Sequence, residues 1–145
     1  MAHNTRVVLG DNILQYGIKR AVEAFRDQPS GARIMLKEVD HPQEYGTAEI
    51  DGARIRRIIE KPKEPPGNLA VIGAYLYGPD VFDILPTLTP SGRRELEITD
   101  VNNAYIAQGE LMYERVEGWW LDAGEDHAAL LKANLTVARE HGVEI

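Results

Sequence analysis

The chain has 145 residues, of which 43% are hydrophobic and 27% charged, a composition typical of one globular domain. Its formal net charge of −7 disfavours nonspecific binding to nucleic acid or anionic membranes, because both are polyanions, and the absence of cysteine excludes disulfides and thiolate metal sites. No apolar run approaches the ~20 residues of a membrane span and the N-terminus has no apolar signal core, so we expect a cytoplasmic protein with a single domain over residues 1–145.

The first part of the chain alternates strand and helix patterns. Residues 6–9 form an apolar run that predicts a buried strand, followed by turn residues at 10–12. Apolar residues recur at helical spacing over 14–25, which predicts a helix, and residues 32–39 predict a second strand. Asp51-Gly52 between two strand-like runs predicts a two-residue β-hairpin.

The second part begins with a proline-rich stretch at 61–68 that predicts a loop, because proline removes backbone donors and fixes φ. Thr99 is expected to cap a helix that ends before Gly109. The remaining patterns predict strands over 69–77 and 111–116, a short helix after Pro79 and a long helix over 126–141.

Alternating strands and helices predict an α/β fold with a mixed, mostly parallel central sheet flanked by helices, the hairpin making the sheet mixed. No Gly-x-Gly motif is present, so the sequence lacks the phosphate-cradling loops of P-loop and dinucleotide folds. The four histidines show no metal-ligand spacing.

Two aspartates are candidate metal ligands. Asp11 directly follows the first predicted strand, where open α/β sheets place ligands, and carboxylate oxygen suits Mg²⁺. Asp122 precedes another glycine turn, and we expect it to face Asp11. The alternatives are an Asp11 that only shapes its turn and an Asp122 that only caps a helix beside core tryptophans.

Glu60 and Lys61 stand at the end of a predicted strand, immediately before a proline. A glutamate there could accept hydrogen bonds from sugar hydroxyls, and the adjacent lysine could meet a phosphate as a point charge. The alternative interpretation is a solvated ion pair at the start of the proline-rich loop.

The order of six short motifs resembles the glucose-1-phosphate thymidylyltransferases, within the sugar-1-phosphate nucleotidyltransferase family. The resemblance covers nearly the whole chain, and its specificity comes from the order, since each motif alone is weak. The motifs are Leu9–Asn12, Glu44–Gly46, Glu60–Pro62, Ala70–Tyr77, Glu95–Asn102 and Trp120–Asp122.

This resemblance implies a reaction and a set of site residues. Members of the family join a nucleoside triphosphate to a sugar 1-phosphate and release pyrophosphate. By position, the implied catalytic residues are Asp11, Lys61 and Asp122, the implied ligands of Mg²⁺ are Asp11 and Asp122, and the implied sugar-phosphate contacts are Tyr45, Gly46, Glu60, Lys61, Gly73 and Tyr75.

The sequence departs from the family in two places. Nothing matches the family's N-terminal strand and glycine-rich loop, which grip the triphosphate, and Ala123-Gly124-Glu125 stands where the family usually has Thr-Gly-Thr. We therefore expect a sugar-phosphate-binding part of the domain that is inactive by itself. Its expected partner is a segment with the missing loop, or a second copy of the chain.

Two alternatives to thymidylyl transfer stay open. One is a uridylyl- or guanylyltransferase of the same fold, because the base is read largely by the segment that this sequence does not match. The other is a non-catalytic sugar-phosphate-binding or regulatory subunit, which the absence of a glycine-rich loop favours for this chain alone.

Overall fold

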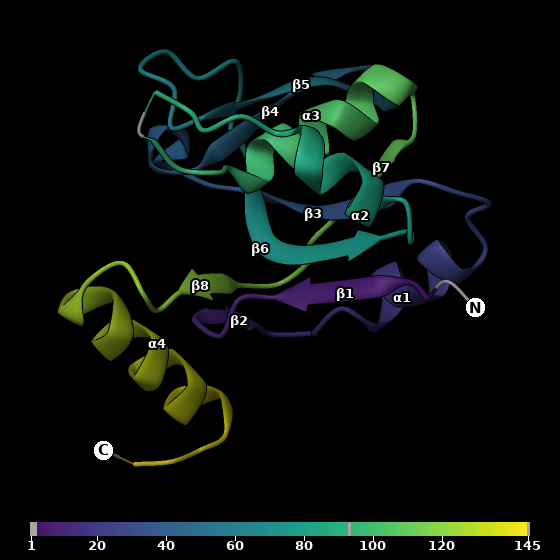
Figure 1. Ribbon diagram of the computed structural model, residues 1–145. Helices are drawn as coiled ribbons and strands as arrows, with labels where there is room; N and C mark the ends of the chain where they lie inside the picture. The colour runs from purple at the N-terminus through teal and green to yellow at the C-terminus, as the bar shows by residue number, and fades with distance from the viewer. Residues whose placement is uncertain (1–2, 93, 145) are drawn as a thin grey trace.

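The computed structural model describes residues 3–92 and 94–144. Within them, a curled mixed sheet carries helices on its faces, and a two-stranded ribbon and a last helix lie to one side (Figure 1). The strands are β1 Thr5–Val8, β2 Asn12–Leu14, β3 Ala32–Glu38, β4 Gly46–Asp51, β5 Arg54–Glu60, β6 Leu69–Tyr77, β7 Leu111–Arg115 and β8 Trp120–Asp122. The helices are α1 Lys19–Arg26, α2 Val81–Ile84, α3 Ile98–Gln108 and α4 His127–Glu140, with 3₁₀ turns η1 Pro42–Glu44 and η2 Leu85–Thr87.

Strand β6 organises the main sheet, whose order is β5-β4-β6-β3-β7 with β1 also paired to β6. β3 runs along one edge of β6 for nearly its whole length, but the register shifts between Ile34 and Leu36, opposite the middle of β6. Such an irregularity bends a strand, and β6 is visibly bent in Figure 1. On its other edge, β4 pairs at Ala70 and β1 pairs from Ala74 onward. That edge therefore splits around Gly73.

The sheet is mixed, as the sequence predicts, but the prediction that it is mostly parallel is wrong for the described strands. Only β3 and β7 pair in parallel, whereas the other pairings are antiparallel. Hydrophobic patterning marks where strands lie but not their direction. The two-residue turn at Gly52-Ala53 requires antiparallel neighbours, and the proline-rich loop returns β6 beside β4 in the opposite direction.

Alternation along the strands builds two hydrophobic layers. On β3, Ile34 and Leu36 face a cluster that contains Val101 and Tyr105 of α3. Met35, between them, faces the opposite cluster with Phe25 of α1. The period of two in strand side chains thus places α3 and α1 on opposite faces of one sheet.

Most predicted elements are confirmed, including the strand over residues 69–77 and the hairpin between β4 and β5. The turn of that hairpin is Gly52-Ala53 and not Asp51-Gly52, because Asp51 pairs with Arg54 as the last residue of β4. Two further details are wrong. Leu14 belongs to β2 and the first helix begins only at Lys19, because the short ribbon pairing takes residues that also fit helical spacing. Thr99 lies inside α3, whose N-cap residue is Glu97.

The last helix, α4, packs against β8 and buries only Ala133 within the described chain. Asp126 caps it by accepting a hydrogen bond from Ala129 N–H at 2.7 Å. None of the described helices combines the length and apolarity that crossing a membrane requires.

A stack of tyrosines lies in the core between β6 and α3. The rings of Tyr75 and Tyr77 lie 6.1 Å apart and those of Tyr77 and Tyr105 lie 5.8 Å apart, nearly parallel in both pairs. Burial is the main reason that the pKa of each phenol is raised, and the carboxylate of Glu60 adds to the shift of Tyr75, whose pKa rises to about 12.

The buried phenols predict a loss of stability at alkaline pH. A phenol with a raised folded pKa contributes stability that is complete below its unfolded pKa, near 10, and is lost as pH rises toward the folded value. We expect the free energy of unfolding to fall between pH 10 and 12, with Tyr75 alone contributing on the order of 2–3 kcal/mol. Urea unfolding measured across this range should show a smaller fall in Tyr75→Phe. Tyr16→Phe, at an exposed position, is the control, and an equal fall in both variants would contradict the assignment to burial.

Candidate functional site

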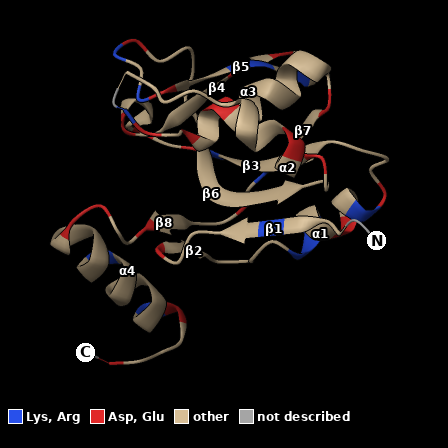
Figure 2. Cartoon of the chain, in the orientation of Figure 1, with Lys and Arg blue, Asp and Glu red and all other residues tan. Residues whose placement is uncertain are grey.

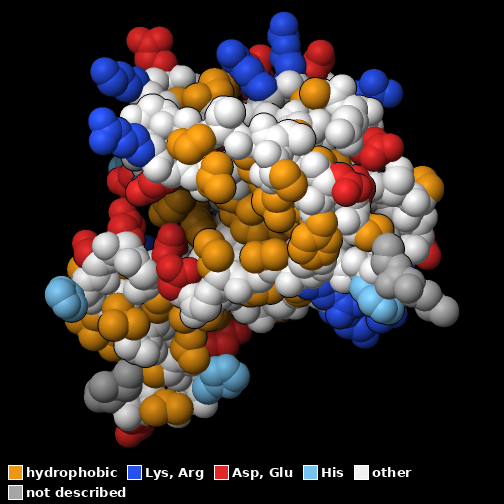
Figure 3. Space-filling model, viewed as in Figure 1, with side chains coloured by type: hydrophobic (Ala, Val, Ile, Leu, Met, Phe, Trp, Pro, Cys, Tyr) orange, Lys and Arg blue, Asp and Glu red, His pale blue; other side chains and the backbone are white. Residues whose placement is uncertain are grey.

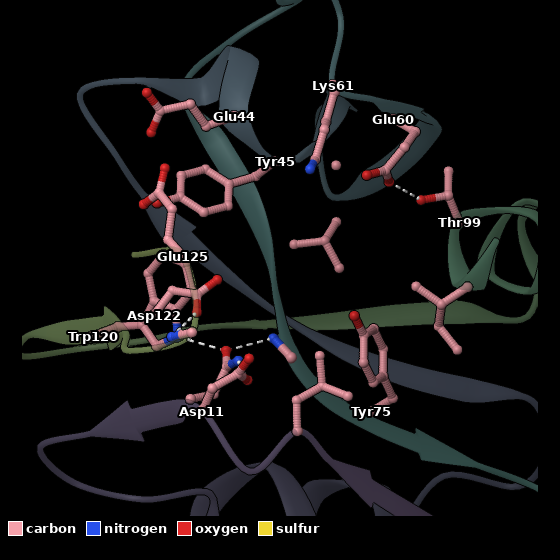
Figure 4. Close-up of a pocket in the computed structure, with 17 residues that line it drawn as sticks. Asp11, Glu44, Tyr45, Glu60, Lys61, Tyr75, Thr99, Trp120, Asp122 and Glu125 are labelled. Carbon is pink, nitrogen blue, oxygen red and sulfur yellow. Dashed lines mark hydrogen bonds between the residues drawn. The ribbon is translucent and has the colours of Figure 1, made fainter. Parts of the chain in front are cut away.

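A cavity of about 420 Å³ opens at the split edge of β6. Figure 4 shows its lining side chains converging from the two sides of that split. Every site residue proposed from the sequence lines it: Asp11, Tyr45, Gly46, Glu60, Lys61, Gly73, Tyr75 and Asp122. The other lining residues are Leu9, Asn12, Glu44, Val71, Ile98, Thr99, Trp120, Gly124 and Glu125.

The open end of the β4–β5 hairpin forms one side of the cavity. The register pairs Gly46 with Glu60, and the backbone N–H of Lys61 donates to the carbonyl oxygen of Tyr45 at 3.1 Å. Two motifs separated in sequence by the whole hairpin therefore lie side by side. A Cβ at Gly46 would lie 3.1 Å from Glu60 Oε2, so the glycine leaves room for that carboxylate.

The β2–β8 ribbon forms the opposite side and brings Asp11 beside Asp122. Asn12 pairs with Asp122, and Ala123 N–H donates to the carbonyl oxygen of Asp11 at 2.8 Å. Both carboxylates lie against Gly124: its N–H donates to Asp122 Oδ1 at 3.0 Å, and a Cβ at this glycine would collide with Asp11 Oδ2. The two aspartates are thus immediate neighbours, as expected from the sequence.

Two side-chain contacts hold the walls of the cavity in place. The rings of Tyr45 and Trp120 meet edge to face, with centroids 5.2 Å apart, so the hairpin end packs against the ribbon. On the far side, the buried Thr99 hydroxyl donates to Glu60 Oε2 at 2.6 Å (Figure 4). The Thr99 hydroxyl thus fixes one carboxylate oxygen of Glu60 and does not cap α3.

Lys61 adopts a backbone conformation that L-residues rarely occupy, with φ at 42°. The left-handed region costs a side chain with a Cβ roughly 1–2 kcal/mol relative to the right-handed region. The hydrogen bond from Lys61 N–H to Tyr45 and the burial of Pro62 hold this turn. Strained backbone of this kind concentrates at functional sites, and here it accompanies a lysine that points into the cavity (Figure 4).

The cavity is strongly acidic. Its lining holds the carboxylates of Asp11, Glu44, Glu60, Asp122 and Glu125, and among the described residues Lys61 is its one lysine or arginine. Figure 2 shows acidic residues where β2, β8 and the segment leading to α4 meet, and Figure 3 shows Asp and Glu side chains at the rim of a hollow beside α4. Burial, followed by the charges of Glu125, Glu44 and Asp122, raises the pKa of the Tyr45 phenol.

The comparison with known proteins agrees with this arrangement. The sequence profile of the nucleotidyl transferase family matches residues 2–140. The chain belongs to this family.

Three relatives and one solved structure show how far the similarity extends. A low-salt glycan biosynthesis nucleotidyltransferase, Agl11 of Haloferax volcanii, is 44% identical over 94% of this chain and 38% of its own length. The UTP–glucose-1-phosphate uridylyltransferase AglF of the same organism is 34% identical over 81% of this chain and 50% of its own length. The glucose-1-phosphate thymidylyltransferase of Streptomyces antibioticus is 37% identical over 91% of this chain and 38% of its own length. A crystal structure of a Bacillus anthracis protein in complex with sucrose is 46% identical, has a TM-score of 0.86, and is matched over 93% of this chain and 55% of its own. The chain thus spans 38% to 55% of these relatives' length.

The paired aspartates have the chemistry of ligands for Mg²⁺. Mg²⁺ is commonly bound through one or two carboxylates, with substrate phosphates and waters completing its shell. Asp11 and Asp122 supply two adjacent carboxylates, and the described residues contain no group of three or more Asp, Glu, His or Cys that could hold a metal alone. The donor set therefore suits an ion that binds together with phosphate oxygens.

Sequence reasoning missed several residues of the site. The sequence indicates no separate role for Asn12 within its motif and favours a helix cap for Thr99, yet both residues line the cavity and hydrogen-bond to its other residues. Glu44 and Glu125 also line it, and Glu125 had no interpretation from sequence. The available signal was position: each lies within or beside a motif whose neighbour was identified.

The strained turn at Lys61 predicts that Lys61→Gly is more stable than Lys61→Ala. Glycine removes the cost of the left-handed conformation but loses more chain entropy on folding, so the net gain should be about 0.5–1 kcal/mol. Lys61→Ala is the matched control, because it removes the same charge and keeps a Cβ. Urea unfolding should give the glycine variant a higher free energy of unfolding than Lys61→Ala, because both variants lose the charge and only glycine relieves the backbone. A glycine variant no more stable than the alanine variant would show that the turn is unstrained.

Proposed function

We propose that this chain forms the sugar-phosphate side of an enzyme that transfers a nucleotidyl group from dTTP to glucose 1-phosphate, giving dTDP-glucose and pyrophosphate. The observation that carries the proposal is the convergence of one lysine, one glutamate held by Thr99, and two adjacent aspartates on one cavity. The 37% identity to the glucose-1-phosphate thymidylyltransferase of Streptomyces antibioticus supports this choice of base and sugar.

In the proposed complex, the hairpin end binds the sugar phosphate. Glu60 accepts hydrogen bonds from sugar hydroxyls through the oxygen that Thr99 leaves free, and Lys61 meets the phosphate. The backbone of Gly46 approaches the sugar closely because no side chain intervenes. Tyr75, a phenol that is neutral at physiological pH, offers its hydroxyl as a donor beside the same phosphate.

Asp11 and Asp122 are the proposed ligands of Mg²⁺. The acidic lining supports this assignment, because two polyanionic substrates would otherwise meet five carboxylates and one lysine. When bound, the ion supplies positive charge that offsets the phosphates and orients their oxygens.

The proposed reaction is one displacement at phosphorus. An oxygen of the sugar phosphate attacks the α-phosphorus of the triphosphate, a new P–O bond forms in line, and the bond to the β-phosphate oxygen breaks to release pyrophosphate. This chain contributes positioning and charge, which together supply most of the catalysis in such transfers. Lys61 holds the attacking phosphate oxygen and neutralises part of its charge.

Two further functions have specific support. Uridylyl transfer by the same fold is favoured by the 34% identity to a UTP–glucose-1-phosphate uridylyltransferase. Sugar-phosphate binding without catalysis is favoured by the cavity lining, in which Lys61 is the one lysine or arginine among the described residues, so little is available to hold a triphosphate.

We expect Lys61 to dominate the affinity for glucose 1-phosphate. Replacing it by alanine removes one charge-assisted contact, which should cost on the order of 1.5–3 kcal/mol of binding free energy. Calorimetric titration of glucose 1-phosphate in the presence of Mg²⁺ measures the difference. Lys63→Ala, which removes an exposed charge two residues away and outside the cavity lining, is the matched control and should bind as the parent does. Equal affinities in the two variants would remove Lys61 from the site.

We also expect this chain alone to give no measurable transfer, and to gain it with a segment that carries the family's glycine-rich loop. Positioning supplies about 7–11 kcal/mol of barrier reduction in a bimolecular step and is lost when one substrate is not held. The purified chain and that segment are assayed separately and mixed, following pyrophosphate release with glucose 1-phosphate, Mg²⁺ and either dTTP or UTP. Turnover by this chain alone would contradict the proposed division of the site. A stable mixture without turnover would favour the non-catalytic function.

A further inference from the structure

The side chain of Asn12 makes three hydrogen bonds to three different parts of the cavity wall. Its Oδ1 accepts from the backbone N–H of Gly73 at 2.8 Å and from Trp120 Nε1–H at 2.8 Å. Its Nδ2 donates to Asp11 Oδ1 at 2.9 Å. Because both incoming groups are donors and the outgoing partner is a carboxylate, the orientation of the amide is determined by its neighbours.

These three contacts join pieces of the fold that the backbone pairs separately. Gly73 lies in the main sheet at the bend of β6, whereas Trp120 lies in the β2–β8 ribbon. A Cβ at Gly73 would lie 2.6 Å from Asn12 Nδ2 and 2.8 Å from its Cγ, so the amide rests directly on the glycine. Any side chain at Gly73 would therefore collide with the Asn12 amide, which explains the glycine at this position.

No other side chain of this size can make the same set of contacts. An aspartate would keep the acceptor for both N–H groups, but it has no donor and would place a second charge against Asp11. A leucine would leave the N–H groups of Gly73 and Trp120 unpaired in a half-buried wall. The amide oxygen accepts from the two N–H groups, and the amide nitrogen donates to the carboxylate of Asp11.

We propose that Asn12 is a positioning residue that fixes the carboxylate of Asp11 relative to the sugar-phosphate side of the cavity. It acts through Asp11, holding one carboxylate oxygen so that the other is directed toward Gly124 and Asp122. Its bond to Gly73 then ties that direction to β6, which also carries Tyr75. This inference rests on the proposed function, because it assigns Asp11 to the ion shared with the sugar phosphate.

A double-mutant cycle between Asn12 and Asp11 tests the inference. Glucose 1-phosphate is titrated calorimetrically, with Mg²⁺, into the parent chain, Asn12→Ala, Asp11→Ala and the double variant. We expect Asn12→Ala to weaken binding roughly tenfold in the parent and by less than twofold when Asp11 is already alanine. Asn134→Ala, at an exposed position of α4, is the control and should change nothing. Where Asn12→Ala does not fold, Asn12→Ser, which keeps one hydroxyl for an N–H of the wall, replaces it.

Two results of the cycle would overturn the inference and leave the proposed function intact. Equal losses in both backgrounds would mean that Asn12 contacts the ligand itself and does not act through Asp11. Full affinity in Asn12→Ala would mean that the amide has no influence on binding. A parent chain that binds no glucose 1-phosphate would instead contradict the proposed function.

A ligand-free measurement then decides the role of Asn12 independently. In a Trp119→Phe background, Trp120 is the single tryptophan, and its emission reports the ring that Asn12 holds. If Asn12 fixes this wall, Asn12→Ala should shift the emission maximum and increase quenching by acrylamide, while Asn134→Ala should not. An emission spectrum and quenching constant unchanged by Asn12→Ala would show that the wall is held without the amide, and would overturn the inference.

Discussion

The bend of β6 at Gly73 is the constraint on which the rest of the site depends. A straight strand would carry one continuous neighbour along its free edge, and hydrogen-bonded backbone would fill the space that the cavity occupies. Because β6 bends, β4 pairs with its first part and β1 with its last, and the edge between them opens. The bend itself depends on a residue without a side chain, since Asn12 and Leu9 occupy the position a Cβ would need.

The gap in the edge of β6 determines which segments can place functional side chains in the cavity. The hairpin end arrives from β4 and β5 with Glu60 and Lys61, and the ribbon arrives after β1 with Asp11 and Asp122. Backbone pairing within the hairpin holds the first group and pairing within the ribbon holds the second. The contact between the rings of Tyr45 and Trp120 joins the two. The proposed division of the lining into a side for sugar hydroxyls and a side for a metal ion rests on this geometry, because the two groups enter the cavity from opposite ends of the split.

The same arrangement is costly to the fold. Lys61 is held in a left-handed conformation, and several carboxylates gather with one lysine among the described lining residues. Like charges at short range destabilise a folded chain unless cations or ligands offset them. A site of this kind is stabilised by what it binds, since any ligand that prefers the folded state adds to its stability. Stacked, buried tyrosines and the two hydrophobic layers lie next to the site, and their burial stabilises the fold around it.

The sequence by itself determined the strands with strong apolar patterns, the hairpin between β4 and β5, and the identity of the motif residues, because those features depend on local chemistry and on order along the chain. Only the tertiary structure decided the directions of the strands, since patterning is the same in parallel and antiparallel sheets. It also decided the role of Thr99. A threonine hydroxyl can cap a helix locally, but here it donates to Glu60, which lies far away in the sequence. Asn12 shows the limit most clearly: its three partners come from its own turn, from β6 and from β8, and no local pattern can bring them together.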